Sequence, residues 1–201
     1  MKNLSLLPIL FLSFALVSCK KDAADPITPA VETAKLIVIS DFQADGFGVD
    51  RFAYFRFSDS AVVAFADSGS IKWDVAFKST TIRTNSGTSG PGNGGAIVSR
   101  GTSFDDVTDA PTTGYGIDTA SNKLAIKTGS GNGWYNYNTT TNIITPIPGV
   151  VLIIRTGDGK FAKIELLSYY KGALSTPDAN STARYYKFKY SYNSDGSTHF
   201  D

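Results

Sequence analysis

Residues 150–170 read VVLIIRTGDGKFAKIELLSYY, two apolar runs joined by a short polar turn. The runs are rich in β-branched and aromatic side chains, the residue types that favour strands. Between them, residues 156–159 end in an Asp-Gly pair, which is a strong short-range signal for a hairpin turn. This stretch therefore predicts two neighbouring antiparallel strands.

Short runs of strand-forming residues continue along the chain on both sides of this hairpin. Residues 184–190 alternate in the manner of a half-buried strand. Further strands are predicted on the N-terminal side at 36–39, 51–57, 61–65, 73–77 and 96–98. Clusters of Gly, Ser, Thr and Asn separate these runs, and only residues 103–107 suggest a helical turn. We expect an all-β fold with a single antiparallel domain, built as a sandwich or a curved sheet.

The first 18 residues have the features of a secretory signal peptide. Lys2 supplies the positive start, and the apolar run from Leu4 to Val17 is shorter than the about 20 residues that a membrane-spanning helix needs. The run ends in Leu16-Val17-Ser18-Cys19, which resembles the lipobox of bacterial lipoproteins. That resemblance implies cleavage before Cys19, lipidation of Cys19 and attachment to the outer membrane.

The residues after Cys19 predict the domain organisation of the mature chain. Lys20-Lys21-Asp22 loosely resembles the signal that sends Bacteroidetes lipoproteins to the cell surface. The Ala-, Pro- and Thr-rich segment that follows is typical of a flexible stalk. We expect a lipidated tether over 19–34, a β domain over 35–193 and a C-terminal tail over 194–201.

Composition excludes several classes of function. The 19 basic residues against 18 acidic ones give a net charge of +1, too close to neutral for a nucleic-acid-binding protein. One Cys, one Met and one His leave no basis for a disulfide scaffold or a Cys/His zinc site. His199 lies beyond the last predicted strand, where chains commonly fray, so a His-activated nucleophile is not expected. We expect a protein that is not an enzyme and has no resident metal site.

Two motifs imitate known ligand sites. Residues 90–95 satisfy the pattern G-x-G-x-x-G, but a dinucleotide site needs a helix after it, and residues 96–98 predict a strand. Residues 41–46 imitate the start of a calcium loop, yet Phe52 stands where that loop needs a Glu. A turn is the favoured interpretation in both places. A loose calcium site through Asp41, Asp45 and Asp50 stays open.

A longer glycine-rich segment carries a family resemblance. The chain reads WDVAF at 73–77 and IRTNSGTSGPGNGGA at 82–96, followed by APTTGY at 110–115 and RTGDGKFAKI at 155–164. Together with the Tyr-rich final strand, this pattern resembles the HmuY family of Bacteroidetes lipoproteins over about residues 35–193. The resemblance implies an all-β haem-binding protein that serves haem acquisition with a TonB-dependent outer-membrane receptor. Since Trp73 and Phe77 lie four apart, we expect them to share a face beneath the glycine loop.

The sequence departs from this family where the haem ligands belong. The resemblance implies an axial pair of His or Met on loops, one of them on a long insertion between residues 127 and 133. Here only residues 128–132 fill that gap. The second ligand position implied by the family falls near Tyr137, and tyrosine can ligate haem iron. Tyr135 and Tyr137 are therefore the candidate haem contacts.

Two alternatives stay open from the sequence. Tyr137 is either a haem contact or an ordinary cross-strand aromatic of the 134–137 segment. Likewise, the whole protein is either a haem-binding surface lipoprotein or a haem-independent surface module that binds a glycan or a protein partner.

Overall fold

The computed structural model describes residues 34–45 and 50–200. The predicted signal peptide, Cys19 and the tether up to residue 33 lie outside these residues. No helix within the described ranges is long and apolar enough to cross a membrane.

The fold is all-β and every strand pairing in it is antiparallel, as the sequence predicts. The largest sheet has the order β1-β11-β10-β9-β6, from strands Ile37–Gln43, Ala183–Asn193, Phe161–Tyr170, Val150–Arg155 and Gly95–Arg100. A four-stranded sheet has the order β3-β2-β4-β5, from Ala61–Val63, Ala53–Arg56, Val75–Lys78 and Thr81–Thr84. A separate hairpin pairs β7 (Tyr135–Asn138) with β8 (Ile143–Pro146). The only regular helices among the described residues are the 3-10 turns η1 (Phe65–Asp67) and η2 (Lys171–Ala173).

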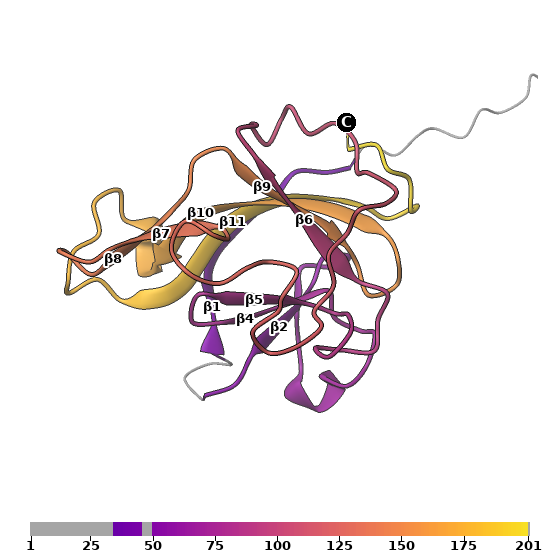
Figure 1. Ribbon diagram of the computed structural model, residues 1–201, viewed down its shortest axis with the longest axis horizontal. Coiled ribbons are helices and arrows are strands. Elements are labelled where there is room, and N and C mark those ends of the chain that lie inside the picture. Colours follow the sequence, from indigo (N-terminus) through magenta and orange to yellow (C-terminus); the bar gives the residue numbers. More distant parts are fainter. Residues whose placement is uncertain (1–33, 46–49, 201) are drawn as a thin grey trace, which may run out of the picture. The chain divides into compact units, whose positions relative to one another are not determined.

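The five-stranded and four-stranded sheets lie on either side of an aromatic core (Figure 1). Phe77 of the smaller sheet stacks on Phe188 of the larger one, with ring centroids 5.6 Å apart. Phe42 bridges the same two layers by contacting both Phe55 and Phe188. Most of the aromatic side chains are therefore core residues, and the two sheets form a sandwich.

The larger sheet is also covered on its outer face. In β9, Val150, Leu152 and Ile154 belong to the main core, whereas Val151 and Ile153 pack with Phe104 and Phe200 in a second cluster. Alternate residues of a strand point to opposite faces. Burial on both faces explains why this strand is continuously apolar rather than alternating.

The structure differs from the sequence prediction at the C-terminal tail. Residues 194–200 follow β11 but pack against the outer face instead of fraying. Phe200 is buried, and its backbone N–H donates to Thr108 O at 2.8 Å. The apolar ring of Phe200 anchors a segment that its position in the chain suggested would be loose.

One packing prediction is wrong. Trp73 precedes β4, which begins at Val75, so the two-residue alternation does not reach back to it. Trp73 packs with Val63 and Ala76 on one side of the small sheet, while Phe77 lies in the main core on the other. Only Trp73 lies beneath the glycine loop.

Candidate ligand-binding site

The glycine-rich segment is a structural support and not a ligand loop. Asn85 is fully buried; its Nδ2 donates to Ser70 O at 2.9 Å and to Trp73 O at 2.8 Å. Its Oδ1 accepts the backbone N–H of Gly92 at 2.9 Å. A Cβ on Gly90 would lie 2.2 Å from Asn85 Oδ1 and 2.6 Å from Trp73 Cζ2. The segment therefore folds tightly over its own backbone, and β6 follows it where a dinucleotide site would need a helix.

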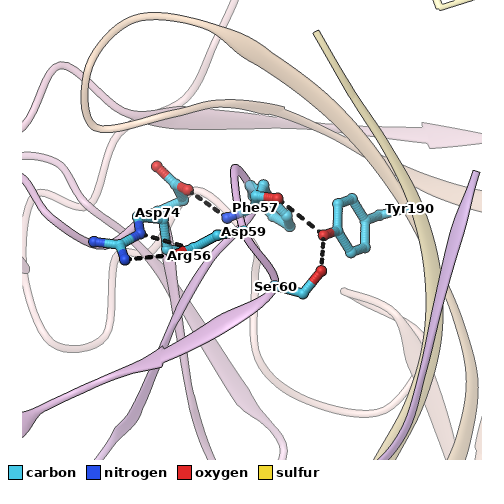
Figure 2. Close-up of polar contacts among 6 residues, drawn as sticks. All are labelled: Arg56, Phe57, Asp59, Ser60, Asp74 and Tyr190. Atoms are coloured by element: carbon cyan, nitrogen blue, oxygen red, sulfur yellow. Dashed lines mark hydrogen bonds and ion pairs between the residues drawn. The ribbon is translucent and has the colours of Figure 1, made fainter. Parts of the chain in front are cut away.

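Asp74, which follows Trp73 in the chain, forms a hydrogen bond with the turn between β2 and β3 (Figure 2). Its carboxylate is buried and accepts the backbone N–H of Phe57 at 2.8 Å and of Gly157 at 3.3 Å. Burial raises the pKa of Asp74 to about 6, although these two hydrogen bonds oppose the shift. On the other side of the turn, Tyr190 Oη donates to Phe57 O at 2.9 Å and lies 2.7 Å from Ser60 Oγ.

The short loop over 128–132 marks the position at which the family resemblance predicts a long insertion. Arg100, at the end of β6, donates from Nη2 to the carbonyl oxygens of Asn132 at 2.6 Å and Gly133 at 2.8 Å. A Cβ on Gly133 would lie 2.1 Å from Lys127 O, so the two ends of the loop are in close contact. The hydrogen bonds from Arg100 and this close approach keep the two ends of the loop together.

A hollow of about 510 Å³ opens beside this loop, and we call it the lysine hollow. Its lining is Ile117, Thr119, Asn122, Lys123, Leu124, Lys127, Thr128 and Asn132. Leu124 is buried and Ile117 is exposed, so the hollow offers an apolar surface. Within the described residues, neither Lys123 nor Lys127 forms an ion pair with a carboxylate. Such a site suits a ligand with an apolar body and an anionic edge.

The two candidate tyrosines lie in β7, outside the lining of this hollow. Tyr135 is buried against Trp134, and its Oη accepts the hydroxyl of Thr80 at 3.3 Å. Tyr137 is 40% exposed, pairs with Ile144 across the hairpin and donates from Oη to Asn142 Oδ1. Tyr137 therefore occupies the cross-strand position that the sequence left open, and its hydroxyl is the more accessible of the two.

The other side chains considered from the sequence are engaged elsewhere. His199 Nδ1 lies 3.1 Å from Asp109 Oδ1, next to the anchored Phe200. Figure 1 shows the C-terminal end well separated from the β7–β8 hairpin. Asp41 accepts the N–H of Gly172, Asp45 pairs with Arg184, and Asp50 pairs with Lys78. Over the ranges that the structure describes, no group of three or more His, Cys, Asp or Glu side chains could hold a metal ion.

Comparison with known proteins identifies the family. The profile described as HmuY protein matches residues 49–190, which is most of the sequence. The chain belongs to the HmuY family. Its glycine-rich segment, sandwich and Tyr-rich last strand thus have the family origin that the sequence suggests, and HmuY membership itself points to haem as the ligand.

Solved structures agree on the fold. An apo HmuY analogue from Tannerella forsythia is 17% identical, with a TM-score of 0.52 over 81% of this chain and 98% of that one. A candidate lipoprotein from Bacteroides fragilis is 18% identical, with a TM-score of 0.50 over 84% of this chain and 95% of that one. At these identities the likeness establishes the fold alone. The search of curated proteins finds no match.

The residues of this HmuY-family chain do not fit haem iron held between two axial side chains. The described residues include no Met and no Cys, and their single His is paired with Asp109 far from the hairpin. Among residues 34–45 and 50–200, no His or Met side chain lies opposite Tyr137 as a second donor. The lysine hollow, in contrast, combines two lysines with apolar side chains, the groups that would suit an apolar ring with carboxylates along one edge.

Sequence reasoning missed the lysine hollow and the role of Arg100. Lys123 and Lys127 lie in irregular chain, four residues apart, and no strand period indicates that they border one cavity. Arg100 contacts a loop about thirty positions away in the sequence. The only signal available was the shortness of the 128–132 segment, which does point to the correct region.

Proposed function

We propose that this chain is a non-enzymatic, surface-anchored haem-binding lipoprotein of the HmuY type that serves haem acquisition. The observation that carries the proposal is the position of the lysine hollow. It adjoins the 128–132 segment, the place at which the family resemblance puts a haem ligand. Lys123 and Lys127 would hold the two propionates, while Ile117 and Leu124 would contact the ring. The affinity would then come from contacts to the porphyrin ring and its propionates and not from two axial ligands of the iron.

The test compares haemin with metal-free protoporphyrin IX. Titration of the purified protein should shift the Soret band of both, with dissociation constants within about threefold, since no axial pair distinguishes them. Replacing Lys123 and Lys127 by Gln should weaken both by roughly tenfold, because exposed ion pairs contribute about 0.2–1 kcal/mol each and tenfold is about 1.4 kcal/mol. Raising the salt concentration should also weaken the binding of both ligands, because salt screens the charges of the lysines.

A matched control and two contrary outcomes make this test decisive. Lys35→Gln removes an exposed lysine outside the hollow and should leave binding unchanged. Failure of both ligands to bind would refute haem binding. Haemin binding that survives the double substitution but is lost in Tyr137→Phe would refute the lysine hollow and assign the iron to Tyr137, with Tyr135 as its buried neighbour.

A second candidate function is a haem-independent surface module on the same scaffold, binding a glycan or a protein partner. The observation that favours it is the loop over 128–132, which Arg100 pins and which lacks any iron ligand of His or Met type. This function predicts no specific porphyrin affinity. Replacement of residues 132–140 should abolish binding of the true partner, and unchanged binding would exclude a role for this loop face.

The proposal also covers where the protein is located and which partner receives the haem. We propose that Cys19 carries the lipid and that a TonB-dependent outer-membrane receptor takes the haem. Cys19→Ser should move the protein from the membrane fraction to the soluble fraction, because a chain without its acyl groups has no anchor. Protease treatment of intact cells then distinguishes the cell surface, where the protein is digested, from the inner leaflet, where it is protected.

A further inference from the structure

A second cavity lies on the other side of the β7–β8 hairpin from Tyr137, and we call it the threonine groove. Its volume is about 660 Å³. Its lining is Asn138, Thr140, Thr141, Asn142, Ile143, Thr145, Ser175, Thr176, Pro177, Asp178 and Ala179. Asn138 pairs with Ile143, and Thr145 is two residues further on, so these three share one face of the hairpin. Residues 175–179 form the opposite wall.

The walls of the groove are hydroxylated and almost uncharged. Five hydroxyls, from Thr140, Thr141, Thr145, Ser175 and Thr176, make no side-chain hydrogen bond within the part of the chain that the structure describes. The one carboxylate, Asp178, already accepts the N–H of Asn180 at 2.9 Å and the hydroxyl of Ser181 at 3.0 Å. No cationic side chain lines the groove. Its lining therefore carries no positive charge that would attract an anion.

Two side-chain amides, Asn138 and Asn142, line this groove. Asn138 Oδ1 accepts the backbone N–H groups of Thr140 at 2.9 Å and Thr141 at 3.1 Å. Asn142 Oδ1 accepts the hydroxyl of Tyr137. Since both amide oxygens are engaged, both Nδ2 groups are left as donors. The lining of the groove thus includes amide N–H donors beside hydroxyls that can donate or accept.

Two apolar side chains, Ile143 and Pro177, also line the groove. Ile143 is buried and Pro177 is half-buried. A ligand that matches this arrangement has many neutral hydroxyls and C–H surfaces between them. We propose that the threonine groove binds a neutral oligosaccharide. The site is separate from the lysine hollow, so it stands or falls independently of haem binding.

Calorimetric titration with neutral oligosaccharides tests this site. The probes are maltoheptaose, cellohexaose and mannohexaose, with oligogalacturonate as a charged comparison. At least one neutral probe should bind, and oligogalacturonate should bind more weakly because the groove holds a carboxylate and no cation. A double variant, Thr141→Val with Thr176→Val, keeps side-chain volume and should weaken binding about tenfold, the loss of two ordinary hydrogen bonds.

Controls separate this site from the rest of the protein. Thr113→Val removes an exposed hydroxyl outside the groove and should change nothing. Lys123→Gln with Lys127→Gln should also leave oligosaccharide binding intact, even where it weakens porphyrin binding. The proposal is overturned if no neutral probe binds to protein that circular dichroism shows to be folded. It is equally overturned if wild type and the threonine double variant bind alike.

Discussion

At the scale of single residues, Asn85 connects three parts of the chain through one amide group. Its hydrogen bonds reach Ser70, Trp73 and Gly92, and the Asn85 side chain itself is fully buried. A buried polar group that loses its partner costs about 1–3 kcal/mol. The three contacts therefore make this side chain more important for stability than its size suggests.

Substitution of this amide should be severely destabilising. Asn85→Ala leaves two carbonyl oxygens and one N–H without a partner, so we expect a loss of about 3–5 kcal/mol in the free energy of unfolding. Urea denaturation measures this value. Asn136→Ala, at an exposed position in β7, serves as the control and should cost less than about 1 kcal/mol. A loss below that figure for Asn85→Ala would contradict the role assigned here.

Asp74 should make the folded protein more stable as the pH falls. Its pKa of about 6 in the folded protein exceeds the ordinary value of 3.8, because burial disfavours the charged form. The folded state then binds the proton more tightly than the unfolded state, so the contribution of Asp74 to stability increases as pH falls from above 6 towards 3.8. Most other shifted carboxylates, such as Asp59 beside Arg56, have lowered pKa values and act in the opposite direction.

The substitution Asp74→Asn isolates this effect. Between pH 7 and pH 4, wild type should gain on the order of 2–3 kcal/mol relative to the variant, since each pKa unit corresponds to about 1.4 kcal/mol. Parallel denaturation curves at several pH values give this difference directly. A wild-type-minus-variant difference that stays constant over the range would show that the pKa of Asp74 is not raised.

At the scale of elements, a guanidinium from β6 binds the C-terminal end of the loop over 128–132. Arg100 is the last residue of β6, and the carbonyls that it binds precede β7. Within the loop, Gly131 donates to Tyr135 O at 2.9 Å. The loop next to the lysine hollow thus depends on a contact with the end of a strand of the large sheet.

Removing this contact should loosen the loop without unfolding the domain. In Arg100→Ala we expect hydrogen exchange at the amides of Gly131 and Asn132 to accelerate by about tenfold, the effect of losing about 1.4 kcal/mol of local stability. Exchange measured by mass spectrometry reports this change. Arg51→Ala, which affects only the contact of Arg51 with Phe65, is the matched control. Equal exchange in wild type and Arg100→Ala would exclude a pinning role.

Prediction from sequence succeeded for long apolar elements and missed the short strands β5 and β8. The hairpin of β9 and β10 and the last strand β11 were predicted because their pattern persists over many residues. β5 and β8 have only four residues each, and β7 was indicated only by the alternation of residues 134–137. Their pairing is set by tertiary contacts, such as the bond from Trp134 Nε1 to Thr80 O.

The candidate site was predictable only in part. The sequence indicates the region, since the loop over 128–132 is short and tyrosines follow it. It does not indicate the lysine hollow, which is formed by irregular chain between residues 117 and 132, or the threonine groove, which joins residues 138–145 to residues 175–179. Cavities of this kind arise from the folded chain and leave no period in the sequence.

At the scale of the whole domain, the outer face of the large sheet depends on the C-terminal tail. Lys163 is buried there, and its Nζ donates to Phe104 O at 3.0 Å and to Val107 O at 2.9 Å. The same Nζ lies 5.4 Å from the centroid of the Phe200 ring. The tail therefore shields a buried cation from water.

Removal of the terminal ring should destabilise the domain as a core substitution does. For Phe200→Ala we expect a loss of about 3 kcal/mol in the free energy of unfolding, the usual cost of truncating a buried Phe. Phe65→Ala, at a site that is 51% exposed, should cost less than about 1 kcal/mol. Thermal denaturation compares the two. A loss for Phe200→Ala no larger than for Phe65→Ala would mean that the tail contributes little.

The pairing of the first strand with the last governs when this domain can close. Within the five-stranded sheet β1 pairs only with β11, so residues 37–43 find no strand partner until residues 185–190 have been made. At about 5–20 residues per second, synthesis separates these two events by on the order of ten seconds. Throughout that interval β1 has no neighbour in its sheet, so the large sheet is completed late in synthesis.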